Sequence, residues 1–196
     1  MPLGTHKATL FGVAGVSTGD VVLLSTQTAS DSSSLDFTSG IDSTYGEYIF
    51  KFYNINPATD NTHFSFQVNA VGETGFNEIM TTTMFRPYHD EDDSVTSLSY
   101  STGQDQAQGT AFQQMSQDAG NGADECSAGI LHLFSPSSTT YVKHFYSRVN
   151  TYHQLNYTFD FFAAGYINTT SAIDEISFKM SSGNFDGTIK MWGVKN

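Results

Sequence analysis

The strongest pattern in this sequence is a two-residue alternation of aromatic and polar positions on either side of a turn. Before the turn, one side of an extended chain would carry Tyr48, Phe50 and Phe52, and the other side Ile49, Lys51, Tyr53 and Ile55. After the turn, apolar residues alternate with polar ones, as in a strand buried on one face, at Phe64, Phe66, Val68 and Ala70. Residues 56–61 between them include Pro57 and indicate a loop. The pattern predicts an antiparallel pair of strands, with Phe50 and Phe64 inside the core.

Similar stretches predict further strands at residues 20–27, 35–37, 79–85, 95–101, 130–134, 141–150, 157–167, 173–181 and 188–194. Pro87 is expected to end the 79–85 strand and to leave residues 88–93 as a surface loop. Apolar residues between 107 and 119 follow a helical spacing, which predicts one short helix at about residues 110–118. The expected fold is therefore all-β: an antiparallel β-sandwich of jelly-roll type with one short helix.

Residues 1–18 lack this alternation and carry regularly spaced glycines. We expect them to form an attachment arm for a partner, with Leu10, Phe11 and Val13 as candidate apolar anchors, and residues 19–196 to form the sandwich domain. The apolar stretch at residues 8–16 is short and interrupted by glycine, so we predict neither a membrane span nor a targeting segment.

The net charge of −12 limits the partners of the chain. Its eight Lys and Arg residues are scattered, which argues against nucleic acid, and an acidic protein is repelled by anionic membranes. Cys126 is the single cysteine, so no internal disulfide is expected. We expect Cys126 to act as a small hydrophobic residue, with an interchain disulfide left open.

Catalytic motifs are weak. Ser17 lies in a G-x-S-x-G match, but a strand follows it where a nucleophile elbow needs a helix, so we expect no hydrolase activity. Asp160, Asp174 and Glu175 could belong to a glycosidase pair, although such pairs leave no local signature. We therefore predict that the protein is not an enzyme.

Two acidic stretches and six histidines could suggest metal ions. The first stretch, Asp90 to Asp93, and the second, with Asp118, Asn121, Asp124 and Glu125, lack the spacing of an EF-hand, so both are expected to be solvated loops. Whether the first holds calcium is left open. The histidines lack zinc-ligand spacing and are expected to bond to neighbouring backbone groups. No metal or cofactor is predicted.

Aromatic residues near loop edges are the better binding signal, because a flat apolar ring with a polar tip suits sugars and protein partners. The candidate surface-binding residues are Tyr88, His89, Tyr152 and Tyr157.

Several phrases of the sequence carry a family resemblance, among them DFTSGIDSTYGEYIFKF, NINPATDN, TTTMFRPYH, LHLFSPSSTTYVKHF and the ending AAGYINTTSAIDEISFKMSSGNFDGTIKMWGVK. From about residue 9 onwards the chain resembles virion structural proteins, of the tail, fibre or decoration type, from tailed bacteriophages that infect marine bacteria. The resemblance implies a non-enzymatic virion component, made in the host cytoplasm, that binds capsid or tail proteins and forms a homo-oligomer. The alternative is a carbohydrate-binding or receptor-binding module for host glycans. The position in the particle stays open, and no functional residue carries over.

Overall fold

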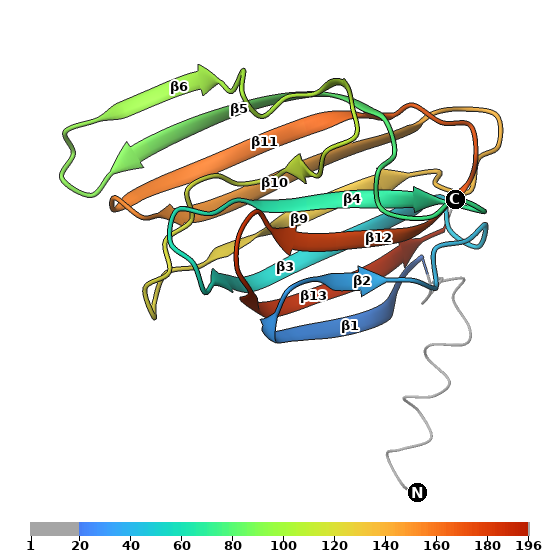
Figure 1. Ribbon diagram of the computed structural model, residues 1–196, viewed down its shortest axis with the longest axis horizontal. Helices are drawn as coiled ribbons and strands as arrows, with labels where there is room; N and C mark the ends of the chain where they lie inside the picture. Colours follow the sequence, from blue (N-terminus) through green and yellow to red (C-terminus); the bar gives the residue numbers. More distant parts are fainter. Residues whose placement is uncertain (1–19, 196) are drawn as a thin grey trace, which may run out of the picture.

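The computed structural model describes residues 20–195, and every regular element among them is a β-strand (Figure 1). The strands are β1 (Val21–Ser32), β2 (Leu35–Phe37), β3 (Glu47–Pro57), β4 (Phe64–Ala70), β5 (Met80–Asp90), β6 (Thr96–Tyr100), β7 (Ala107–Gly109), β8 (Gln113–Gln114), β9 (Ser127–Phe134), β10 (Lys143–His153), β11 (Tyr157–Ile167), β12 (Ile173–Met180) and β13 (Phe185–Val194). Within this part of the chain no helix is long and apolar enough to cross a membrane. The expected arm, with Leu10, Phe11, Val13 and Ser17, lies outside the described residues.

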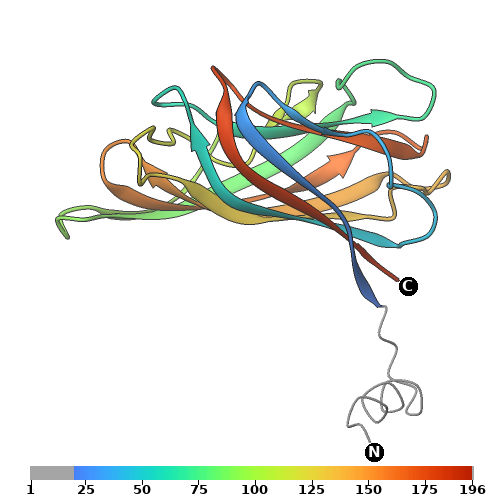
Figure 2. The ribbon, with the colours of Figure 1, turned by 90° about the horizontal axis from the view of Figure 1, so that it is seen from below.

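The strands form two antiparallel sheets. The larger has nine strands in the order β1-β13-β3-β9-β10-β11-β5-β6, with β7 also paired to β5. The smaller has four, in the order β2-β12-β4-β8. Figure 2 shows the sheets as two layers, and in Figure 1 the strands β2, β4 and β12 lie over one part of the large sheet while β5 and β6 extend beyond them. The prediction of an all-β fold built from antiparallel sheets is confirmed.

The core between the layers is aromatic. Phe178 of β12 lies at its centre, with its ring centroid 5.3 Å from Phe50 and from Phe52 and 6.0 Å from Phe64. All four side chains are buried. Burial of each such side chain contributes about 1.5–3 kcal/mol, so this cluster stabilises the contact between the sheets. The predicted core positions of Phe50 and Phe64 are confirmed.

The predicted pairing of the two alternating stretches is wrong. β3 pairs with β13 and β9, whereas β4 pairs with β12 and β8 in the other sheet. Their aromatic faces meet across the core instead, with the rings of Phe52 and Phe64 5.1 Å apart. An alternating pattern specifies which face is buried and leaves the neighbouring strand undetermined, so an inter-sheet contact satisfies it as well as a hairpin does.

Ile55 also departs from its predicted face, because it is fully buried. The register of β3 shifts between Phe52 and Ile55, where Asn54 has a φ of 52°, and this bulge returns Ile55 to the core side. Opposite the bulge, Gly187 has a φ of 144°, and a Cβ there would lie 2.9 Å from the carbonyl oxygen of Asn54. Glycine is needed at this position on both grounds.

β4 is buried on both faces and not on one face as predicted. The amide nitrogen of Gln67 lies 3.0 to 3.1 Å from the carbonyl oxygens of Glu78, Thr110 and Ala111, which belong to the loops that cover its outer side. Polar side chains on this strand are therefore buried with hydrogen-bond partners, which the alternation of polar and apolar residues does not reveal.

The predicted helix at residues 110–118 is absent, and the segment contains β8 instead. Its backbone bonds with distant strands: Ser65 pairs with Gln114, and the N–H of Met115 donates to the carbonyl oxygen of Phe64 at 2.8 Å. The buried Met115 occupies the core, as its spacing suggested, but in extended backbone. Pairing to an otherwise open sheet edge outweighs a weak helical pattern of this length.

β5 does not end before Pro87, as expected, but continues to Asp90. Its register with β11 pairs Phe85 with Phe162 and Tyr88 with Phe159, and skips the two positions between, where Pro87 has no N–H to donate. Residues 88–90 therefore belong to the strand, and the surface turn is confined to the residues after Asp90.

Candidate binding site

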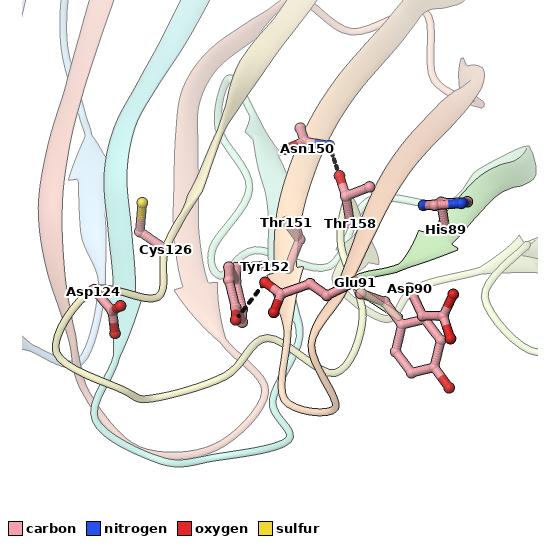
Figure 3. A pocket seen from close by; sticks show the side chains of 10 residues that line it. His89, Asp90, Glu91, Asp124, Cys126, Asn150, Thr151, Tyr152 and Thr158 are labelled. Carbon is pink, nitrogen blue, oxygen red and sulfur yellow. Dashed lines mark hydrogen bonds between the residues drawn. The ribbon is translucent and has the colours of Figure 1, made fainter. Parts of the chain in front are cut away.

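The ends of β5, β10 and β11 and the segment before β9 enclose a cleft of about 420 Å³ (Figure 3). It is lined by His89, Asp90, Glu91, Asp124, Cys126, Asn150, Thr151, Tyr152, Tyr157 and Thr158. The structure thus brings together three of the four residues predicted to bind at the surface: His89, Tyr152 and Tyr157.

Tyr88, the fourth, is not part of the lining. Its ring lies 4.8 Å from Phe159 and 6.0 Å from Tyr157, and it packs on a second apolar cluster on the inner side of β5 and β11. Because β5 continues through Pro87, Tyr88 and His89 point to opposite faces of the sheet. Tyr88 supports the cleft from behind by its contact with Tyr157.

Two hydrogen bonds fix the polar groups of the cleft, and both are drawn in Figure 3. The hydroxyl of Tyr152 donates to Oε1 of Glu91 at 2.9 Å, and this bond raises the pKa of Tyr152. The amide of Asn150 donates to the hydroxyl of Thr158 at 2.9 Å. The cleft therefore offers a neutral phenol, a carboxylate, an amide and a hydroxyl in fixed positions.

Asp90 shapes the turn beside the cleft. Its carboxylate accepts the N–H groups of Ser94 and Val95 at 2.9 and 2.8 Å, and the hydroxyl of Ser94. These bonds, that from the Ser94 side chain first, lower the pKa of Asp90. Asp93 is largely exposed and lies 3.0 Å from Nε2 of His89. Among residues 20–195 no three histidine, cysteine or acidic side chains are placed to hold a metal ion, so the calcium alternative gains no support.

In the second acidic stretch, Asp118 lies between two histidines. Its carboxylate is 3.5 Å from Nε2 of His153 and 3.7 Å from Nδ1 of His63, and the interaction with His153 is the main cause that lowers the pKa of Asp118. Nδ1 of His63 accepts the backbone N–H of Asp118, and Nδ1 of His153 accepts that of Leu155. For these two histidines the predicted bond to a nearby backbone group is confirmed.

The acids considered for glycoside hydrolysis do not converge. Asp160 forms an ion pair with Arg148, with a closest distance of 2.7 Å, on the large sheet. Asp174 and Glu175 belong to β12 of the small sheet, where Glu175 accepts a hydrogen bond from Asn69. Because Asp174 and Glu175 lie on one sheet and Asp160 on the other, neither of the two can flank the same glycosidic bond as Asp160.

The outer face of the large sheet, which points away from the small sheet, is an aromatic surface that the alternating patterns did not predict. Of the twelve large hydrophobic residues that are exposed in the described chain, seven lie on it: Val21, Leu23, Tyr53, Phe85, Leu98, Tyr100 and Tyr146. The rings of Phe85 and Phe162 stack with centroids 4.8 Å apart. The signal was present in residues 157–167, where apolar residues fall on both faces of one strand.

Two adjoining depressions hollow this face, with volumes of about 480 and 270 Å³. Both are lined by Thr83, Tyr146 and Ala164, so they form one groove. Ala164 pairs with Tyr146 on one side and Thr83 on the other, which places two small side chains between larger neighbours.

In comparison with known proteins, no protein-family model matches the chain and no curated protein is significantly similar to it.

Proposed function

We propose that the chain is a non-enzymatic structural component of a tailed-phage virion, of the capsid-decoration or tail-fibre type, attached through residues 1–18. The observation that carries the proposal is the exposed aromatic outer face, because soluble proteins seldom expose a broad apolar surface unless it contacts something. The resemblance of the sequence to virion proteins supports the same role. The two antiparallel layers are compatible with a jelly roll, an architecture common among capsid and lectin domains.

The test uses particles that lack the native protein. The full chain, a variant without residues 2–17, and a point variant with Leu10, Phe11 and Val13 each changed to Ser are mixed with such particles, and incorporation is measured after purification. We expect incorporation of the full chain and loss of incorporation for both variants, because the apolar anchors are removed. Ser43→Arg, an exposed loop change, is the control. Normal incorporation of the truncated chain would contradict attachment through the arm, and absence of the protein from native particles by mass spectrometry would contradict the virion role.

A second function, recognition of host glycans, is favoured by the cleft. Tyr152 provides a ring face for the apolar side of a sugar, and Asn150 and Glu91 provide groups for its hydroxyls. Tyr157 also lines the cleft, but its ring packs against Tyr88 and Phe159. We expect binding on a glycan array that falls at least tenfold in Tyr152→Ala and in Asn150→Ala. Tyr141→Ala removes a 74 % exposed tyrosine outside the cleft and is the matched control. An array without binding, or equal loss in all three variants, would contradict this function.

A further inference from the structure

Two rows of side chains cross the outer face at right angles to the strands. The central row follows the registered pairs from β13 to β5 and consists of Trp192, Ile49, His132, Tyr146, Ala164 and Thr83. The basic-aromatic row lies two residues further along each strand and consists of Lys190, Lys51, Ile130, Arg148, Phe162 and Phe85. Each row takes one side chain from each of the same six strands.

The two halves of each row differ in chemistry. In the central row, the half on β13 and β3 carries the bulky Trp192 and Ile49, while the half on β11 and β5 is the groove above Ala164 and Thr83. In the other row, β13 and β3 carry lysines, while β11 and β5 carry the stacked rings of Phe162 and Phe85. The bulky Trp192 and Ile49 and the two lysines thus lie on β13 and β3, and the small side chains and the stacked rings lie on β11 and β5. Between them, β10 adds Tyr146 and a further cation, Arg148, which lies over the ring of Phe162.

We propose that two copies of this chain pack outer face to outer face, about a two-fold axis that runs parallel to the strands between β9 and β10. This axis places β3 of one copy over β11 of the other, and β13 over β5. Ile49 then enters the groove at Ala164 of the second copy, and Trp192 faces Thr83. Lys51 and Lys190, which lie over the rings of Trp192 and Tyr53 in the single chain, then face Phe162 and Phe85 of the second copy, where their aliphatic stems can pack on the aromatic pair.

A two-fold axis across the strands would give a poorer fit. It would place each strand over its own copy, so that Ile49 meets Ile49 and the groove at Ala164 meets an identical groove. The bulky side chains would then clash with one another while the grooves remained empty. Such a contact would lack the packing density of a protein interior, which a stable interface needs. The arrangement of the rows therefore selects the axis along the strands.

The two rows contribute no repulsion between acidic groups when two copies meet at this face. The chain carries 20 acidic and 8 basic residues, yet the two rows contain three of the basic residues and no acidic one. The nearest carboxylates are already paired, Asp160 with Arg148 and Glu47 with His132. Two strongly acidic chains would repel one another through most surfaces, and this face has no unpaired acid in its rows.

The size of the face suits a modest dimer. A third row, on the other side of the central row, runs from Val194 on β13 to Thr81 on β5. Six strands spaced about 4.8 Å apart, and three rows of side chains at two residues each, give roughly 600 Å² of flat area. A standard interface buries about 800 Å² per partner, and smaller ones belong to weak complexes. We therefore expect association that depends on protein concentration and that is strengthened by multiple copies on a particle.

Cross-linking of two single-cysteine variants tests the axis. In a Cys126→Ser background, Ile49→Cys and Ala164→Cys are made in chains of different size, mixed, and treated with a short bismaleimide, because facing sheets lie about 10 Å apart. We expect a cross-linked heterodimer from the mixture and little product from either variant alone. The control is a mixture in which Ser43→Cys replaces Ala164→Cys. The proposal would be overturned if each variant cross-linked to itself, or if the yield of heterodimer did not exceed that of the control mixture.

Sedimentation equilibrium of the full chain provides the second test. Ala164→Arg fills the groove and should weaken self-association at least tenfold, whereas Ser43→Arg adds the same charge in an exposed loop and should leave it unchanged. Circular dichroism is used to check that both variants are folded. A wild-type chain that stays monomeric at all concentrations, or equal dimerisation of the three proteins, would overturn the proposal. Neither test requires a virion. Failure of self-association can therefore be distinguished from failure of the proposed virion role.

Discussion

The two faces of the nine-stranded sheet carry the same residue types but differ in what covers them. On the inner face Phe50 and Phe52 are buried against Phe178 of the small sheet. On the outer face Phe85 is 43 % exposed and stacks on Phe162 without a covering layer. Aromatic alternation therefore marks a face that needs a contact. The inner face has its contact within the chain, and we propose that the outer face has its contact in a second molecule.

The largest effect is expected on the inner face. Phe64→Ala removes a fully buried ring that contacts Phe52, Phe178 and Phe185. Its loss should lower the free energy of unfolding by about 3–5 kcal/mol, because a cavity remains between the sheets. Urea denaturation monitored by circular dichroism measures the change. An unfolding midpoint equal to that of the wild type would show that the core is assigned wrongly.

A smaller effect is expected where β11 and β5 approach closely. A Cβ at Gly165 would lie 2.5 Å from the carbonyl oxygen of Thr81, so Gly165→Ala should destabilise the fold by about 1–3 kcal/mol. Gly103→Ala is the control, since nothing lies within 4 Å of the added atom. Thermal unfolding of both variants measures the difference. Equal melting temperatures would contradict the close approach of these strands.

A pH-dependent effect is expected at Tyr48. This side chain is fully buried, its hydroxyl donates to the carbonyl oxygen of Asp42 at 3.0 Å, and burial raises its pKa to about 12. Because the unfolded chain ionises near pH 10, the stability from neutral Tyr48 is present below pH 10 and is lost as the pH rises towards 12. Tyr48→Phe should lower stability by about 1 kcal/mol at pH 7 and reduce its decline above pH 10. Unfolding curves at pH 7, 10 and 11.5 measure the free energy of unfolding of both proteins. A parallel decline of this free energy with pH in the two proteins would contradict the prediction.

The sequence was sufficient for the class of fold and for the core faces of β3 and β4, because burial of Phe50 and Phe64 depends only on local alternation. It was insufficient for the partner of each strand, since β3 and β4 satisfy the same pattern from opposite sheets. The position of Ile55 depends on a bulge with Asn54 at a φ of 52°, and no alternation signals it. The spacing near Met115 suggested a helix only because the sheet edge that pairs with this segment is remote in sequence.

The candidate sites were predictable in part for the same reason. The ring side chains near turns predict His89, Tyr152 and Tyr157 as binding residues, and the strand ends bring these three together. The prediction that Tyr88 is a surface-binding residue is wrong, because it assumed that the strand ends at Pro87. The strand β5 continues to Asp90 and directs Tyr88 to the inner face. The rows on the outer face depend on the register of six strands, which places Ile49, Ala164 and Trp192 in one row from distant parts of the chain. Only the structure supplies that register.

The most direct test of the difference between the two faces measures stability and self-association in one variant, Phe85→Ala. Because this ring is partly exposed and stacks on a single neighbour, its removal should cost about 1 kcal/mol in unfolding free energy. Sedimentation equilibrium should nevertheless show dimerisation at least tenfold weaker than in the wild type, since Lys190 of the second copy loses the surface it faces. The account would be contradicted if Phe85→Ala lowered the free energy of unfolding by more than about 3 kcal/mol, as expected for a core aromatic residue, and left dimerisation unchanged.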